Sequence, residues 1–251
     1  MSGDYPVLAH IYDRIGMNAF GDQMTPQIID YIQRCGWMGR QILDLGTGTG
    51  ASLAWVTKHG YITTGMDQAP EMIEVAADNF AALGLSCRHV VQDIRQIDYP
   101  GEFDLALAIN TLNEMSSISD LENTFLSVHR ILKDSQWFVF DLYTIQGLLQ
   151  QLGDQQVLQH ASTDSLSVFS ISQFDYERQM HQRRFTIFHK TDETWQRQHA
   201  DLVRRAYPIK GVAALLKRCG FTIVDIVGLD FETYHPDSSR ADRVIFIAQK
   251  E

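Results

Sequence analysis

The residues that most clearly indicate a ligand-binding site form one stretch, in which a short apolar run leads into alternating glycines. The stretch reads Ile42-Leu43-Asp44-Leu45-Gly46-Thr47-Gly48-Thr49-Gly50, and a helix-like segment follows it. Glycine has no Cβ, so the backbone can turn sharply and a ligand can lie directly against its N–H groups. The pattern predicts a strand, a loop that binds a nucleoside or a phosphate, and the start of a helix. A lone Gly-x-Gly is also compatible with a plain strand-to-helix turn.

Two further carboxylates follow the next two strand-like runs. Asp67 closes the run 62–66, and Asp93 follows the run 87–91. In a βαβ unit an acid at the end of the second strand can accept both hydroxyls of a ribose. A carboxylate after the third strand is placed to accept the exocyclic amine of an adenine. The three motifs together predict a nucleoside site at one edge of a parallel sheet.

A dinucleotide ligand must also be considered. Gly46-x-Gly48-x-x-Ala51 satisfies the relaxed dinucleotide-binding fingerprint, which keeps an NAD-dependent oxidoreductase among the alternatives. The carboxylate at Asp93, after the third strand, favours an adenosine ligand that is not a dinucleotide.

The whole set, Asp-x-Gly-x-Gly-x-Gly and then an acid after each of the next two strands, resembles the class I S-adenosylmethionine-dependent methyltransferases. The chain is similar to their small-molecule branch, which includes glycine and amino-sugar N-methyltransferases. The resemblance implies in-line transfer of a methyl group from S-adenosylmethionine to oxygen or nitrogen of a small acceptor. A protein that binds this cofactor without methylating, as in aminopropyl transfer or regulation, remains an alternative. The cofactor-binding residues that the resemblance implies are Tyr12, Asp44, Gly46, Thr47, Gly48, Gly50, Asp67, Gln68, Met72, Asp93, Ile94 and Asn110.

Hydrophobic periodicity predicts alternating strands and helices, and thus an α/β fold. The resemblance implies that the strands form a doubly wound, seven-stranded Rossmann-like sheet that ends in an antiparallel hairpin. The nearly continuous apolar run 103–109 is typical of a strand buried on both faces, and it leads into a polar loop, 110–114, expected to form a wall of the site. The expected strands are 42–45, 62–66, 87–91, 103–109, 136–142, 221–228 and 243–249, and the expected helices are 51–59, 69–83, 121–132 and 209–218.

The remaining segments extend this core and define three parts. Residues 1–36 are expected to form a helical cap, 37–142 and 208–251 the cofactor-binding core, and 143–207 an inserted antiparallel sheet that covers the acceptor side. The cap should contain helices over 5–15 and 26–35 joined by a mobile loop, with Thr25 as helix cap and Pro26 in the first turn. Alternating apolar residues predict the inserted strands 166–176, 181–189 and 194–205.

Methyl transfer to an alcohol or an ammonium group requires a proton acceptor. The side chains that could take this proton, by location alone, are His181, His189, His199, Tyr143 and Asp141. The four catalytic candidates are Tyr143 and His181 from this set, together with Asn113 and Arg205. Arg204 or Arg205 could instead pair with an acidic acceptor. The sequence predicts no catalytic metal, although Asp141 with Asn110 or Asn113 could mimic a magnesium site.

Composition narrows the possible partners of the chain. Its 251 residues include 45% hydrophobic ones and carry a net charge of -10, which disfavours a nucleic-acid partner. The three cysteines are widely spaced, so they are expected to be reduced, mostly buried residues of a cytoplasmic protein. No apolar run approaches the roughly 18 residues of a membrane span. A small-molecule acceptor and a possible homodimer complete the prediction.

Overall fold

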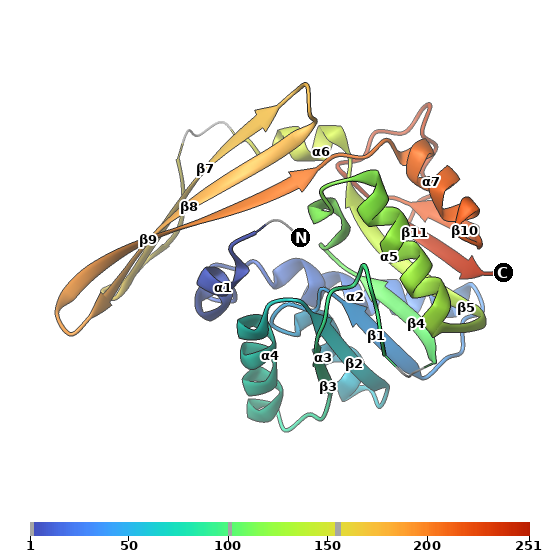
Figure 1. Cartoon of the computed structure of the whole chain (residues 1–251), viewed down its shortest axis with the longest axis horizontal. Helices are drawn as coiled ribbons and strands as arrows, with labels where there is room; N and C mark the ends of the chain where they lie inside the picture. Colours follow the sequence, from blue (N-terminus) through green and yellow to red (C-terminus); the bar gives the residue numbers. More distant parts are fainter. Residues whose placement is uncertain (1–2, 100–101, 154–156) are drawn as a thin grey trace.

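The computed structural model describes residues 3–99, 102–153 and 157–251, and within these ranges the chain folds into two sheets (Figure 1). The larger has seven strands in the order β10-β11-β5-β4-β1-β2-β3. Neighbours among β1 to β5 are parallel, whereas β11 pairs antiparallel with both β5 and β10. The predicted doubly wound sheet with a closing antiparallel hairpin is confirmed. Its strands are β1 Gln41–Leu45, β2 Ile62–Asp67, β3 Arg88–Val91, β4 Phe103–Ala108, β5 Leu132–Tyr143, β10 Phe221–Val227 and β11 Arg243–Lys250.

Apolar side chains alternate between the two faces of this sheet and so create two cores. In β5, Phe138 and Phe140 pack on one face with α5 (Ile118–Ile131) and α7 (Ile209–Arg218). Trp137 and Val139 pack on the other face, where α2 (Ala19–Arg34) and α3 (Ala51–Lys58) cover the sheet, and α4 (Pro70–Ala82) contributes Phe80. Because a strand has a side-chain period of two, this double burial requires the nearly unbroken apolar runs seen in the sequence.

Helix α5 begins three residues earlier than the periodicity predicted. Ser117 accepts the backbone N–H of Asp120, and the Asp120 carboxylate accepts the backbone N–H of Ser117. This capping box satisfies two of the N–H groups that have no partner within a helix end. The helix therefore starts at Ile118 and not at Leu121.

The helical prediction for the N-terminal part is wrong in detail. Residues 5–15 form a short helix α1 (Tyr5–Leu8), a 3₁₀ turn η1 (Ala9–Ile11) and further turns. Helix α2 starts at Ala19 and runs through Pro26, so neither a loop over 16–23 nor a helix start at Pro26 is present. The Thr25 hydroxyl donates to the carbonyl oxygen of Gly21 instead of capping. Burial of Met24 and its neighbours against the core outweighs the hydrogen bond that Pro26 cannot donate.

The inserted region forms the second sheet, with order β6-β7-β8-β9, which projects from the core as a long twisted arm (Figure 1). The three predicted strands and both turns between them are confirmed, and positive φ angles at Gln179, Asp192 and Glu193 mark the turns. The short strand β6 and helix α6 were not predicted, and residues 154–156 of the Gln-rich stretch lie outside the described residues. The elements are α6 Ile145–Gln150, β6 Leu158–Ser162, β7 Leu166–Asp175, β8 Met180–Thr191 and β9 Thr194–Arg205.

The N-terminal segment connects the two sheets. Gly3 forms a β-bridge with Leu202 of β9, and the N–H of Asp4 donates to the carbonyl oxygen of Asp201 at 3.0 Å. Leu8, Ile11 and Ile15 are buried in one cluster with apolar residues of β7, β8 and β9. This segment therefore belongs structurally to the inserted sheet as much as to the core.

None of the helices in the described ranges is long and apolar enough to cross a membrane. All three cysteines are free, but only Cys219 is buried, whereas Cys87 is half-buried and Cys35 is exposed at the end of α2, so the expectation of mostly buried cysteines is wrong.

Candidate active site

The glycine loop lies between β1 and α3, at the carboxyl end of the parallel strands. Gly46, Gly48 and Gly50 all have left-handed backbone conformations, with φ of +67°, +55° and +87°. A Cβ on Gly46 would lie 2.5 Å from the Thr111 side chain, whereas one on Gly48 would meet no atom within 4 Å. Gly46 therefore permits close packing against the loop after β4. Gly48 keeps open space above the loop.

Asp67 ends β2 and orders the glycine loop. Its carboxylate accepts the N–H of Gly48 at 3.0 Å and the N–H of Ala69 at 2.9 Å, and the side chain is buried. Burial raises the pKa of this carboxyl, and the backbone N–H donors act in the opposite direction. Each carboxylate oxygen can accept more than one hydrogen bond, so the fixed Asp67 carboxylate can also accept from a ligand that offers hydroxyl groups.

Asp44 lies beneath the loop and is 1% exposed. It accepts a hydrogen bond from the Ser52 hydroxyl on α3. Burial raises its pKa to about 7, and hydrogen bonds from Ser52 and Thr47 partly offset that rise. Asp44 therefore joins β1 to α3 from inside the protein.

This burial leads to a testable effect of pH on stability. The folded-state pKa of Asp44 is about 7, above the value of 3.8 expected when unfolded, so the folded state binds the proton more tightly between these values. The contribution of Asp44 to stability should fall as pH rises from about 4 to about 7. We expect the free energy of unfolding of Asp44→Asn, from urea titrations across this range, to depend less on pH than that of the wild type. Equal slopes would contradict the assignment.

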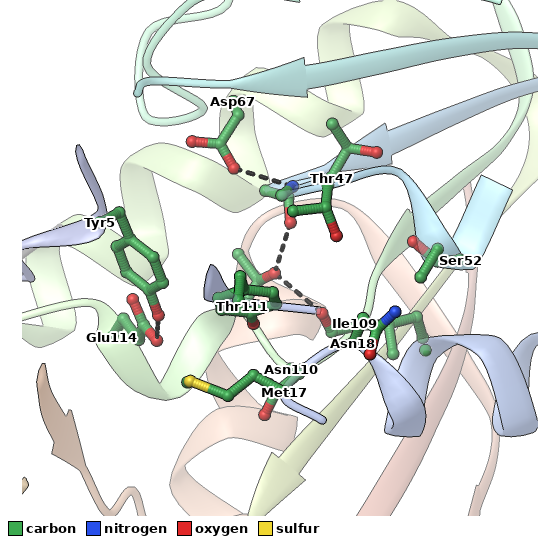
Figure 2. Close-up of a pocket in the computed structure, with 16 residues that line it drawn as sticks. Tyr5, Met17, Asn18, Thr47, Ser52, Asp67, Ile109, Asn110, Thr111 and Glu114 are labelled. Atoms are coloured by element: carbon green, nitrogen blue, oxygen red, sulfur yellow. Dashed lines mark hydrogen bonds between the residues drawn. The ribbon is translucent and has the colours of Figure 1, made fainter. Parts of the chain in front are cut away.

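A cavity opens over the glycine loop, with the N-terminal segment as its roof (Figure 2). Of the predicted cofactor residues, the ones that line it are Tyr12, Gly46, Thr47, Gly48, Asp67 and Asn110. Six other predicted cofactor residues are described in the structure but do not line the cavity: Asp44, Gly50, Gln68, Met72, Asp93 and Ile94.

Asp93 is engaged elsewhere in this structure. Both of its carboxylate oxygens accept hydrogen bonds from the guanidinium of Arg95, with the shortest N–O distance at 2.6 Å. These bonds hold the pKa of Asp93 below its usual value. Adenine binding by Asp93 stays a prediction.

Sequence reasoning missed several residues that line the cavity. Those with polar or adaptable side chains are Tyr5, Met17, Asn18, Ser52, Thr111 and Glu114. Thr111 and Glu114 lie in the polar loop that was expected to form a wall, so this loop was the available signal for them. The first three come from the N-terminal segment, whose path over the loop depends on distant contacts with β9.

Two of the four catalytic candidates, Asn113 and Arg205, connect elements of the fold. The amide of Asn113 accepts the Tyr143 N–H at 2.7 Å and donates to the Arg205 carbonyl oxygen at 2.8 Å, which ties the β4 loop to β5 and β9. Arg205 donates to the carbonyl oxygen of Ser116 at 2.5 Å. Burial, with help from two neighbouring arginines, lowers the pKa of His181 to about 3, so this histidine is neutral at pH 7. Within the described residues none of the four lines the cavity.

A buried ion pair supports the floor beside Asn110. Arg243 lies 3.2 Å from an Asp141 carboxylate oxygen, donates to the Asn110 amide oxygen at 2.8 Å, and stacks over the rings of Tyr143 and Phe20. Asp141 also accepts the Asn110 N–H at 2.6 Å, so its oxygens are committed within the protein. In the described part of the chain, no group of three or more His, Cys, Asp or Glu side chains is arranged to hold a metal.

Comparisons with known proteins agree with this geometry. Residues 42–135 match the family model of a methyltransferase domain. YqeM of Bacillus subtilis, which carries a provisional methyltransferase name, is 27% identical over 98% of this chain and 97% of its own. An S-adenosylmethionine-dependent methyltransferase from Clostridium acetobutylicum has the same fold, with a TM-score of 0.81, 24% identity and 98% coverage of both chains.

A more distant solved structure shares the whole architecture. CalS10, an amino pentose methyltransferase from Micromonospora echinaspora, was solved with S-adenosylmethionine bound. It superposes with a TM-score of 0.72 at 14% identity, over 96% of this chain and 97% of its own. The family match includes the glycine loop, Asp67 and the loop after β4 but not the N-terminal segment that also lines the cavity, and the relatives extend over the inserted sheet. Residues 42–135 therefore match a methyltransferase domain, and the fold of the whole chain is that of an S-adenosylmethionine-dependent methyltransferase.

Proposed function

We propose that this enzyme methylates a small-molecule acceptor at oxygen or nitrogen, and that Asp67 and the loop Gly46–Gly48 hold the cofactor. One observation carries the proposal: a half-open cavity joins a left-handed glycine loop, a fixed carboxylate and a roof of side chains from the N-terminal segment. A roofed cavity favours a small acceptor over a macromolecule, because small-molecule sites bury most of the ligand surface. The net charge of -10 also disfavours a nucleic acid.

The residues fit S-adenosylmethionine. Gly48 leaves open space above the loop, and the Asp67 carboxylate lies beside it, where it can accept ribose hydroxyls. Tyr12 belongs to the roof, where an aromatic ring can contact a sulfonium cation. The cofactor supplies an electrophilic methyl group, so the protein has to orient the acceptor and exclude water.

The proposal gives the three parts of the chain distinct roles. Residues 37–142 and 208–251 bind the cofactor, residues 1–36 cap it, and residues 143–207 shape the acceptor side.

The comparison with CalS10, an amino pentose methyltransferase, supports transfer of the methyl group to nitrogen or oxygen. Free cysteines support a cytoplasmic location. The possible homodimer stays a prediction, and the mass of the protein in solution tests it.

The first test removes the proposed ribose acceptor. Asp67→Asn should weaken binding of S-adenosylhomocysteine at least about tenfold, because charge-assisted hydrogen bonds contribute about 1.5–3 kcal/mol each. Asp93→Asn tests the second predicted cofactor contact in the same assay, because Asp93 lies outside the cavity lining in this structure. Isothermal calorimetry on both folded variants measures the affinities. Unchanged affinity in Asp67→Asn would remove the ribose assignment, and a loss in Asp93→Asn would restore its predicted role.

The second test identifies the acceptor. The wild type and S-adenosylmethionine with a deuterated methyl group are incubated with a library of small metabolites, and mass spectrometry finds the labelled product. We expect labelled small molecules whose new methyl group lies on oxygen or nitrogen. Labelling only of added RNA or protein would contradict the small-molecule assignment.

A further inference from the structure

Glu114 is a buried carboxylate at one wall of the cavity. It ends the 3₁₀ turn η2 (Leu112–Glu114) after β4, is 3% exposed, and lines the same cavity as Gly48 and Asp67. The Tyr5 hydroxyl donates to its Oε1, as the dashed line in Figure 2 shows. A buried carboxylate is costly unless it is paired, so its position in a ligand cavity requires a reason.

The groups around Glu114 come from four separate elements. Tyr5 lies on α1 and Tyr12 follows η1, while Arg204 of β9 has its Nε 3.8 Å from Oε1 of Glu114. The negative charge of Asp67 on β2, which lines the same cavity, raises the pKa of the Glu114 carboxyl group. The contacts of Tyr5 and Arg204 both involve Oε1, so among the described residues Oε2 is the oxygen that can face a ligand.

This environment sets the proton affinity of Glu114. Burial raises its pKa to about 7, while the charge of Arg204 and the hydrogen bond from Tyr5 limit the rise. A group with a pKa near the working pH is the most effective proton carrier, because both of its protonation states are populated. Asp67 also lines the cavity, but two backbone N–H groups hold its carboxylate.

We propose that the acceptor is an amine and that Glu114 binds its ammonium form and takes its proton. The inference rests on the proposed function of the same cavity and adds the chemical class of the reacting group. A carboxylate flanked by the rings of Tyr5 and Tyr12 complements a cation, and rings of this kind attract cations through their faces. An alcohol offers neither the charge nor an acidity close to that of the carboxyl group.

The proton and electron balance closes without a further reactant. The bound ammonium gives a proton to Glu114, which leaves a neutral nitrogen with a lone pair. That pair forms the nitrogen–carbon bond as the carbon–sulfur bond of the sulfonium breaks, and the electrons of the broken bond stay on sulfur. Glu114 then returns its proton to water, and the methylated amine leaves as an ammonium ion.

The test does not require the natural acceptor. Sinefungin carries a carbon-bound amine where S-adenosylmethionine carries its methyl sulfonium, whereas S-adenosylhomocysteine lacks that amine. The ratio of the two dissociation constants, measured by calorimetry, therefore reports a carboxylate near the reacting position. We expect Glu114→Gln to reduce the relative preference for sinefungin about tenfold, with affinity for S-adenosylhomocysteine changed by less than about threefold. Glu122→Gln, at a half-buried carboxylate on α5 that pairs with Arg218 and lies outside the cavity lining, should leave the ratio unchanged.

Wild-type protein alone supplies a second measurement, in case Glu114→Gln fails to fold. The sinefungin preference should fall as pH drops from about 8 to about 5.5, because Glu114 becomes protonated below its pKa of about 7. Tyr5→Phe removes a hydrogen bond that lowers this pKa, so the midpoint of the change should move to higher pH.

The possible outcomes separate the two proposals. A preference for sinefungin that does not depend on pH or on Glu114 overturns the role of Glu114. Equal losses of both ligands in Glu114→Gln would also overturn it, since they indicate a purely structural residue. If the wild type binds neither ligand, the cofactor site itself is wrong and the proposed function fails.

Discussion

Gly48→Val is expected to abolish binding of S-adenosylhomocysteine while the protein still folds. Gly48 has φ of +55°, a conformation that a branched side chain adopts only with strain. No atom lies within 4 Å of the position that its Cβ would take, so a valine side chain would project into open space over the loop. The backbone N–H that Asp67 accepts would also be displaced. We expect affinity to fall at least about a hundredfold, which corresponds to about 2.7 kcal/mol.

Gly84→Val is the matched control for this variant. Gly84 also has a left-handed conformation, with φ of +64°, and open space around its missing Cβ, but it follows α4 away from the cavity. Both variants should therefore lose similar stability from backbone strain. Only Gly48→Val should lose affinity in calorimetry. Retained binding in Gly48→Val would mean that the glycine loop is a plain turn.

Arg243→Ala is expected to produce the largest loss of stability. Arg243 is 3% exposed and pairs with Asp141, which is 1% exposed, so its removal leaves a buried carboxyl group without its cation. Removing one partner of a buried ion pair typically lowers the free energy of unfolding by about 3–5 kcal/mol. For a domain of this size the thermal midpoint should fall by about 10 °C. Loss of the hydrogen bond to Asn110 should also loosen the cavity floor.

Arg184→Ala provides the comparison, because Arg184 forms a similar ion pair with Asp201 on the exposed surface of the inserted sheet. Solvent and salt screen such a pair, so its loss should hardly change the midpoint. Differential scanning calorimetry of both variants measures the contrast. Equal shifts would show that the pair of Arg243 with Asp141 does not stabilise the fold.

The sequence predicted the core of the fold well because its signals are local. A strand buried on both faces needs an apolar run, and the turn from β1 to α3 needs glycines at left-handed positions. The residues of one short motif, 44–50, therefore predicted both the loop and the place of the cavity.

The unpredicted features depend on contacts between distant segments. Helix α2 continues through Pro26 because its apolar face packs on the sheet, a contact that local propensity does not report. Glu114 becomes buried only when Tyr5 and Arg204 pack against it. Tyr5 lies 109 positions before it in the sequence, and Arg204 lies on the inserted sheet. A single glutamate in a polar loop has no sequence pattern that predicts such surroundings.

The inserted sheet is more closely tied to the core than the sequence suggested. From the sequence alone, the sheet should affect only the acceptor side. In the structure, Phe185 and Leu202 pack with Leu8 and Ile11, and the same N-terminal segment carries Tyr12 into the cavity. Changes in the sheet should therefore also reach the proposed cofactor pocket.

The thermal midpoint of the wild type with S-adenosylhomocysteine, compared with the midpoint with NAD at the same concentration, decides which ligand the glycine loop binds. A ligand that binds only the folded state stabilises it by about 2.7 kcal/mol at a hundred times its dissociation constant, or about 5–10 °C for a domain of this size. We predict this rise with S-adenosylhomocysteine and none with NAD. A rise with NAD and none with S-adenosylhomocysteine would contradict the account and assign the glycine loop to a dinucleotide.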